Sequence, residues 1–552
     1  MYSRLIQKIK NFKTHYILKK KNKSFFNTKN KNNKIILIEY NNYRSTHLSQ
    51  ALLSNFFKKQ NAGKIVAYYN YTLMVSPLKI NYIQKLTWRL SSFFSLGFKG
   101  IYRSFGVDKF IRPDVNNKFF QKAELEAKKF FKKKANNSKV INYKVENIWI
   151  GDLLYDTYLK SKLVPTIDVN DEDFYIFFKE FLILFFYWQE FYKKNNVVST
   201  IGVHTCYSFG IPLRISIHNK IPSFAINSRG VMRVDKNIPS MYAGFKLYNK
   251  NFLKYFIQKK NKCLKIAKDN LNLRLGGRTG IDVGLFNREK SSFSKKKSRS
   301  KVLQINSKIK ILICTHDFLD SIHVNGKNLF PDFNLWISYL GDLSNKKKNE
   351  YDFYIKSHPS SGNKYAKYQK YTEIFVNRLI KKYPNIKKIP NETSHKQIIN
   401  EGIKFVLTVY GSVGIEYAAL GIPVINASIN NPHINYNFNI NPSSLKNYKK
   451  ILNNLKKIKL KIKKEEIYEC YFMKHFFHDE NWLFDNYKKF LNKVGGFQNI
   501  HDNKFYEYWI DNFNKKDLNK SYARISNFID NKGYRMSIID TEKDAFSNHL
   551  LG

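Results

Sequence analysis

The residues best suited to chemistry lie in short segments of the second half of the chain, each directly after an apolar run. Lys356-Ser357-His358-Pro359 joins a lysine and a histidine, both of which can donate to phosphate oxygens. Tyr410-Gly411-Ser412-Val413-Gly414 leads into a predicted helix, whose free N-terminal N–H groups can hold phosphate. The predicted phosphate site consists of Lys356, His358, Gly411, Ser412 and Gly414. His358 is also a catalytic candidate, because a protonated histidine can stabilise charge that builds on a leaving phosphate. Alternatively, Ser412 only caps the helix and the glycines only form a turn.

One carboxylate, Glu416, follows in a segment that otherwise holds small and apolar residues. If Ser412 is the N-cap, Glu416 lies one position beyond the place of a capping-box glutamate. Two carboxylate oxygens suit the neighbouring hydroxyls of a ribose, as in dinucleotide sites. Glu416 is therefore either a ribose ligand or an exposed helix glutamate.

A third segment, residues 315–333, is dense in histidine and aspartate. Such a cluster can bind metal or serve acid–base chemistry, but its spacings match no zinc pattern, so we expect no metal. Asp317 is a candidate for acid–base catalysis. Three histidines are candidates for positioning the substrate: His316, His323 and, from the segment after residue 428, His433.

The first half offers two candidates for a base that deprotonates an acceptor hydroxyl. Asp152 lies one helical turn before Asp156, on the same face of a predicted helix. His204 ends a predicted strand, and Arg214 follows in the next helix as a substrate-positioning candidate. The alternatives are an acidic face at a helix N-terminus and a hydrogen-bonded structural histidine.

The elements that must position these residues alternate between strand and helix. An apolar run at 34–40, a helical pattern at 47–60 and a second run at 64–71 form a βαβ unit, which implies a parallel sheet. The pattern returns with strands at 197–204 and 222–227 and, in the second half, with strands at 308–314, 350–356, 385–390, 405–409 and 422–428. We therefore predict an α/β fold of two Rossmann-like, doubly wound domains that face each other across a cleft, where open α/β sheets bind ligands.

The predicted division of the chain has five parts. These are a basic leader (1–33), an N-terminal acceptor domain (34–290), a linker (291–307), a C-terminal donor domain (308–495) and a polar tail (496–552).

Composition limits the partners. The chain has 552 residues and a formal net charge of +54, yet Lys, Asn, Ile, Phe and Tyr are abundant together, as in proteins from AT-rich genomes. We therefore expect no nucleic-acid partner, and a residual basic face would favour an anionic membrane surface. The absence of a secretory signal predicts a cytoplasmic protein, and the four scattered cysteines predict reduced thiols. The most apolar stretch, 174–192, carries three charges and predicts a buried helix.

The segments 356–359 and 411–423 resemble the donor half of GT-B glycosyltransferases, most closely bacterial capsule and surface-polysaccharide biosynthesis proteins. In related sialyl- and Kdo-transferases, a His-Pro element and a later serine turn hold the phosphate of a CMP-sugar, which implies these roles for His358 and Ser412. A glutamate before an Ala-x-Gly-x-Pro-Val element often binds the donor ribose, which implies that role for Glu416. The acidic catalytic element of sialyltransferases has no counterpart in this sequence.

The sequence thus predicts a glycosyltransferase that moves a sugar from a nucleotide-sugar to a growing capsule or other surface glycan. We expect the acceptor glycan to be lipid-linked and the enzyme to need no metal or cofactor. Two enzymatic alternatives share the architecture: a teichoic-acid-type polyol-phosphate transferase and a sugar-nucleotide epimerase. An alternative of another class is a non-catalytic polysaccharide-assembly or nucleic-acid-binding protein.

Overall fold

The computed structural model describes residues 2–26, 32–70, 81–113, 119–278, 293, 300–358, 362–477, 481–484, 486–496 and 499–536. Eight of the 17 residues of the predicted linker, 291–307, lie outside these residues.

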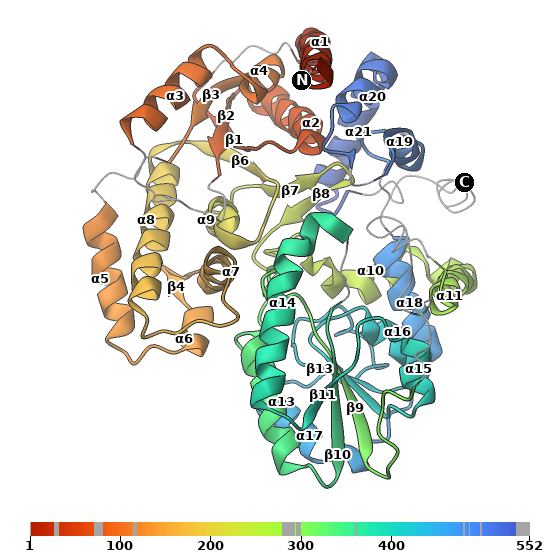
Figure 1. Cartoon of the computed structure of the whole chain (residues 1–552). Coiled ribbons are helices and arrows are strands. Elements are labelled where there is room, and N and C mark those ends of the chain that lie inside the picture. Colours follow the sequence, from red (N-terminus) through yellow and green to blue (C-terminus); the bar gives the residue numbers. More distant parts are fainter. Residues whose placement is uncertain are drawn as a thin grey trace.

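The first half forms a six-stranded sheet with the order β3-β2-β1-β6-β7-β8 (Figure 1). Its strands are β1 (Ile35–Tyr40), β2 (Lys64–Tyr69), β3 (Val107–Ile111), β6 (Val197–Gly202), β7 (Ser223–Asn227) and β8 (Gly230–Val234). All neighbours pair in parallel except β7 and β8. Because the chain extends the sheet from β1 in one direction and from β6 in the other, the topological switch point lies between β1 and β6.

The second half forms a five-stranded, all-parallel sheet with the order β11-β10-β9-β12-β13. Its strands are β9 (Ile309–Cys314), β10 (Tyr351–Lys356), β11 (Ile386–Lys388), β12 (Phe405–Thr408) and β13 (Val424–Asn426). Its switch point lies between β9 and β12. The predicted fold class, α/β with two Rossmann-like domains of the GT-B type, is confirmed.

Helices cover both sheets. The predicted buried helix is α8 (Glu172–Lys194), whose aromatic face is part of the main apolar core. Within the described residues, no helix is long and apolar enough to cross a membrane. Other elements that position the site are α2 (Arg44–Asn61), α5 (Phe120–Phe131), α6 (Asn137–Ile141), β4 (Lys144–Val145), β5 (Ile148–Trp149), α7 (Gly151–Lys162), α9 (Ile211–His218), α13 (Phe333–Lys346), α14 (Gly362–Lys382), α15 (His395–Asn400), α16 (Val413–Ala419) and α17 (Leu445–Asn453).

The end of the predicted N-terminal domain packs on the C-terminal domain instead. Helices α10 (Tyr248–Tyr255) and α11 (Lys260–Leu275) lie against α16 and α18 (Lys464–His475). Phe252 and Leu271, for example, share one apolar cluster with Ile415 and Phe472. The apolar faces of these helices require a partner surface, but periodicity does not identify which one.

The C-terminal segment crosses back to the N-terminal domain, so the prediction of a polar tail is wrong as far as Met536. Helices α19 (Tyr487–Val494), α20 (Lys504–Asn512) and α21 (Lys515–Asp530) bury Phe490, Phe505 and Trp509 in the core around β1 and α2. Figure 1 shows the blue α20 beside the red α1 (Tyr2–Phe25). The predicted leader is thus also part of the fold, because α1 packs on α20 and on α4 (Phe98–Ser104).

Candidate functional site

The carboxyl ends of the two sheets face each other at the domain boundary. Tyr207, in the loop after β6, places its hydroxyl 3.3 Å from the carbonyl oxygen of Leu319 and 3.4 Å from Oδ1 of Asp320, both in the loop after β9. Ser240 adds a hydrogen bond of 2.7 Å to the carbonyl oxygen of Val324 in the same loop. Loops from both switch points therefore meet at one boundary, as the sequence predicts for a ligand site.

His316 lies at the switch point of the C-terminal sheet and joins two of the predicted loops. Its Nε2 is 3.1 Å from Oγ1 of Thr408 and accepts the backbone N–H groups of Val409 and Tyr410 at 3.3 and 3.4 Å. Because Nε2 accepts, the proton of the neutral ring is on Nδ1. Burial, with a smaller contribution from nearby His358, lowers the pKa of His316 to about 3. His316 is therefore a neutral group that shapes the loop after β12.

The loop after β10 joins the same edge. The backbone N–H of His358 donates to Oγ1 of Thr315 at 3.0 Å, while the His358 side chain is exposed. At Gly411 an added Cβ would lie 2.9 Å from Thr408 Oγ1 and 3.3 Å from the His316 ring, so the close approach of the loops requires glycine. Ser412 has helical backbone angles and makes no capping bond, so the alternative that it only caps the helix is wrong. The structure thus brings together His316, His358, Gly411 and Ser412.

Lys356 does not belong to this group, and its predicted phosphate role is wrong. Its buried Nζ donates to the carbonyl oxygens of Pro390, Asn391 and Thr393 at 3.2, 3.0 and 3.0 Å. An ammonium has three hydrogens, and all three are used here. Lys356 therefore ties the loop after β11 to β10.

The absence of a side chain at Gly414 makes room for a buried histidine. A Cβ at Gly414 would lie 2.4 Å from Cε1 of His433. His433 is fully buried, with its Nδ1 3.2 Å from the Asn439 amide nitrogen, and burial lowers its pKa to about 3. Because no part of His433 reaches the surface, its predicted role in positioning substrate is wrong. The backbone N–H of Gly414 donates to the carbonyl oxygen of Gly411 at 3.0 Å, and the phosphate role of Gly414 stays a prediction.

Glu416 is buried and paired. Its Oε1 accepts from Nε of Arg274 at 2.8 Å and lies 2.6 Å from Nη2 of the same guanidinium. The alternative of an exposed helix glutamate is therefore wrong, and the ribose role stays a prediction. Sequence reasoning missed Arg274, because nothing in the pattern of α11 predicts which carboxylate its last turn will meet.

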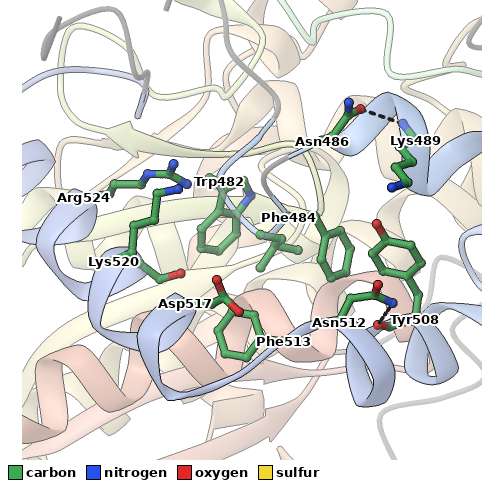
Figure 2. Close-up of a pocket in the computed structure, with 12 residues that line it drawn as sticks. Trp482, Phe484, Asn486, Lys489, Tyr508, Asn512, Phe513, Asp517, Lys520 and Arg524 are labelled. Carbon is green, nitrogen blue, oxygen red and sulfur yellow. Dashed lines mark hydrogen bonds between the residues drawn. The ribbon is translucent and has the colours of Figure 1, made fainter.

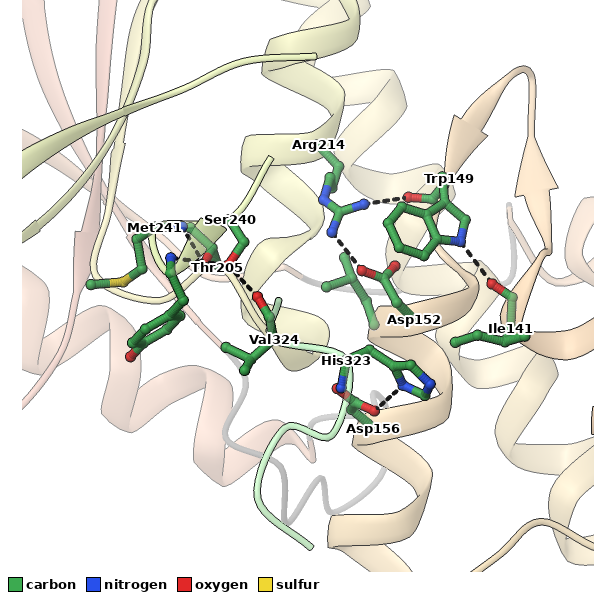
Figure 3. A network of polar contacts seen from close by, with 12 residues as sticks. Ile141, Trp149, Asp152, Asp156, Thr205, Arg214, Ser240, Met241, His323 and Val324 are labelled. Atoms are coloured by element: carbon green, nitrogen blue, oxygen red, sulfur yellow. Dashed lines mark hydrogen bonds and ion pairs between the residues drawn. The ribbon is translucent and has the colours of Figure 1, made fainter. Parts of the chain in front are cut away.

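In the first domain, Asp152 and Arg214 form a buried ion pair. Nη2 of Arg214 donates to Oδ2 of Asp152 at 2.5 Å, and Nη1 donates to the carbonyl oxygen of Trp149 at 3.1 Å (Figure 3). The guanidinium also lies over the indole of Trp149, 4.9 Å from the ring centroid. Since both charged groups are buried, the predictions of Asp152 as a base and Arg214 as a substrate ligand are wrong.

His323 also has a structural partner. Its Nδ1 is 2.6 Å from Oδ1 of Asp156, and its backbone N–H donates to Oδ2 at 3.1 Å (Figure 3). Burial acts to lower the pKa of His323, but Asp156 outweighs it and the pKa is raised. His323 is fully shielded from solvent, so its predicted contact with substrate is wrong.

Asp317 orders its own loop. Its Oδ1 accepts the backbone N–H of Leu319 at 2.9 Å and lies 3.2 Å from Oγ1 of Thr372 on α14. The side chain is half-buried, and a catalytic role for it stays a prediction.

His204 lies at the switch point of the N-terminal sheet with a buried carboxylate behind it. Its Nδ1 is 3.9 Å from Oε1 of Glu39, and its side chain is 30% exposed. Glu39 in turn accepts the backbone N–H of Val203 at 2.8 Å. Sequence reasoning missed Glu39, although a lone carboxylate near the end of an apolar strand was a signal for it. A carboxylate behind a partly exposed histidine is an arrangement that can accept a proton from a substrate.

Two further features lie away from this edge. A pocket of about 210 Å³ lies among the C-terminal helices and is lined by Trp482, Phe484 and Tyr508 among others (Figure 2), and none of the predicted site residues lines it. In the described part of the chain, no group of three His, Cys, Asp or Glu side chains is arranged to hold a metal, and the four cysteines are buried free thiols.

Comparison with known proteins gives only distant likenesses. No family model matches the sequence, and no curated protein matches it. Among solved structures, the beta Kdo 2,4 transferase KpsC of Thermosulfurimonas dismutans is 12% identical, with a TM-score of 0.29, over 50% of this chain and 79% of that one. UDP-GlcNAc 2-epimerase of Neisseria meningitidis is 13% identical, with a TM-score of 0.23, over 80% of this chain and 94% of that one. An alpha,alpha-trehalose-phosphate synthase of Burkholderia vietnamiensis is 8% identical, with a TM-score of 0.24, over 80% of this chain and 96% of that one. At these scores the likenesses carry no argument, and the fold assignment rests on the strand topology.

Proposed function

We propose that this protein is a GT-B glycosyltransferase that moves a sugar from a nucleotide-sugar, with CMP-linked sugars as the first donors to test, to a capsule or other surface glycan. One observation carries the proposal. The two switch points face one boundary, with His204 backed by Glu39 on one side and His316, His358 and Ser412 on the other.

The C-terminal group has the chemistry to bind the donor phosphate. Protonated His358 offsets charge on the phosphate as the bond to the sugar breaks. The Ser412 hydroxyl and the Nδ1–H of neutral His316 supply further donors without adding charge. The glycosidic bond to the phosphate oxygen breaks, a bond to the acceptor oxygen forms, and the nucleotide leaves with the electron pair.

The N-terminal group has the chemistry to activate the acceptor. His204 takes the proton of the attacking hydroxyl, and the buried carboxylate of Glu39 stabilises the imidazolium that results. Glu39 is held in place by the backbone N–H of Val203, so its charge is fixed relative to the ring. The acceptor itself is proposed to be a glycan or lipid-linked glycan.

The test is nucleotide release from a panel of nucleotide-sugars with and without oligosaccharide acceptors. Replacing His358 by alanine should lower turnover about 100-fold, as for loss of an oxyanion donor, and His204→Ala should lower it by about 100-fold or more. His218→Ala, at an exposed position on α9, is the matched control and should have no effect. A bound nucleotide should also raise the melting temperature.

Three results would contradict the proposal. These are unchanged turnover in His358→Ala, nucleotide release that does not depend on acceptor, and no thermal shift with any nucleotide. Transfer from CDP-polyols alone would instead identify a polyol-phosphate transferase.

A further inference from the structure

Helix α3 (Tyr82–Phe93) displays an apolar face to solvent. Five of its large apolar side chains are between 41 and 80% exposed, and no residue of the helix is buried. They are Tyr82, Ile83, Leu86, Leu90 and Phe93. At 100° per residue these five positions fall within one face about 100° wide. The turn that follows adds exposed Phe94 and Leu96. A contiguous apolar surface of this kind marks an interaction site.

The opposite face of α3 holds the helix on the domain. Trp88 packs 5.8 Å from the ring of Tyr40 and 5.5 Å from that of Tyr69. Lys99 lies 3.5 Å from the Trp88 centroid and donates to Ser91 and Ser92 at 2.6 and 2.9 Å. The apolar face therefore points outward because Trp88 and the serines already occupy the inner side.

The segment that contains α3 is strongly basic, which favours an anionic partner. Residues 1–107 contain 20 Lys and Arg but one carboxylate, Glu39, which is buried. AT-rich coding accounts for abundant lysine throughout the chain. It does not account for a single carboxylate in the first 107 residues, since the whole chain has 42 Asp and Glu.

Helix α1 extends this surface. It packs on α4, which directly follows the α3 turn, and Phe12 and Tyr16 are exposed along it. Figure 1 shows α1, α3 and α4 at the end of the molecule remote from the C-terminal sheet. Docking through this end leaves the domain boundary accessible.

We infer that α3 inserts its apolar face into the headgroup region of an anionic lipid bilayer, with the cations of the first 107 residues adding electrostatic attraction. Lys and Arg near such a surface are attracted to its anionic headgroups, and an amphipathic helix lying in the interface buries its apolar face in the boundary between headgroups and acyl chains. A second copy of this chain fits less well, because pairing would bring two strongly basic surfaces together. This inference goes beyond the proposed function and does not depend on it.

The test is co-sedimentation of the full chain with vesicles of phosphatidylcholine alone or mixed 3:1 with phosphatidylglycerol. The wild type should bind the anionic vesicles. The triple variant Leu86→Ser/Leu90→Ser/Phe93→Ser should bind about tenfold more weakly or worse. The matched control is Leu253→Ser/Leu273→Ser/Ile305→Ser, three exposed apolar positions elsewhere, which should bind like the wild type. Since all six positions are exposed, both variants should melt like the wild type.

A second readout separates insertion from charge alone. Leu90→Cys labelled with an environment-sensitive fluorophore should shift to the blue on anionic vesicles, and the four native cysteines are buried and react slowly. Three outcomes would overturn the inference. The first is that the triple variant binds vesicles as well as the wild type, and the second is that the labelled protein binds without a fluorescence shift. The third is that the wild type self-associates and the triple variant differs from it only in being monomeric.

Discussion

His323 and Asp156 form a buried ion pair across the boundary between the two domains, with 2.6 Å between Nδ1 and Oδ1. A second buried contact lies beside it, from the Tyr155 hydroxyl to Oδ2 of Asp332 at 2.5 Å. Opening the boundary would expose or unpair these groups, so they fix how the two carboxyl edges face each other.

The pair makes stability depend on pH. Burial alone would lower the pKa of His323, but Asp156, with Asp152 and Asp332 nearby, raises it above the ordinary 6.5. The resulting stabilisation is fully present below about pH 6.5 and is lost as the pH rises through the raised folded-state pKa. Urea unfolding between pH 5.5 and 8.5 should therefore show the free energy of unfolding falling for the wild type. The His323→Gln variant should be about 3 kcal/mol less stable at low pH and should lack this fall; an identical pH profile would contradict the assignment.

Replacing Lys356 by methionine should destabilise the protein rather than weaken donor binding. The change leaves three carbonyl oxygens without their donor, and we expect a loss of about 3 kcal/mol in the free energy of unfolding. Lys348→Met, at an exposed position on the loop before β10, is the control and should cost less than about 0.5 kcal/mol. A raised donor KM with unchanged stability would restore the phosphate role of Lys356.

Gly414 and His433 should be coupled. Gly414→Ala places a methyl 2.4 Å from the His433 ring and should cost about 1–3 kcal/mol in a packed core. In a His433→Ala background the same change should cost clearly less, because the clashing ring is gone. Denaturant unfolding of the four proteins in the cycle measures this coupling, and additive effects would contradict the packing described.

Arg274 and Glu416 should be coupled in a similar cycle. Arg274→Met leaves a buried carboxylate without its cation and should cost about 3 kcal/mol. The double variant Arg274→Met/Glu416→Gln should recover part of that loss. The KM for the donor then separates the two roles of Glu416. If Glu416 also binds ribose, Glu416→Gln raises this KM both in the wild type and in the Arg274→Met variant. If the pair is purely structural, the KM stays unchanged in every variant that folds.

The sequence by itself determined most strands of the two sheets and the order of the strand-end loops. Apolar runs and helical periodicity are local properties, so β1, β2, β6, β9, β10 and β12 and the buried helix α8 follow from them. Parallel strands bring their carboxyl ends to one edge, which is why the segments that carry His316, His358 and Ser412 meet as predicted.

Only the tertiary structure decided which polar groups remain for a ligand and where the chain ends pack. Glu416 meets Arg274 from 142 positions away, and His323 meets Asp156 from 167 positions away. The sequence of α20 likewise does not predict which surface its apolar face will cover, and the structure places that face on the N-terminal domain. A polar side chain is available for function only after folding has shown that no distant residue uses it, because burial and pairing depend on contacts through space rather than on spacing along the chain.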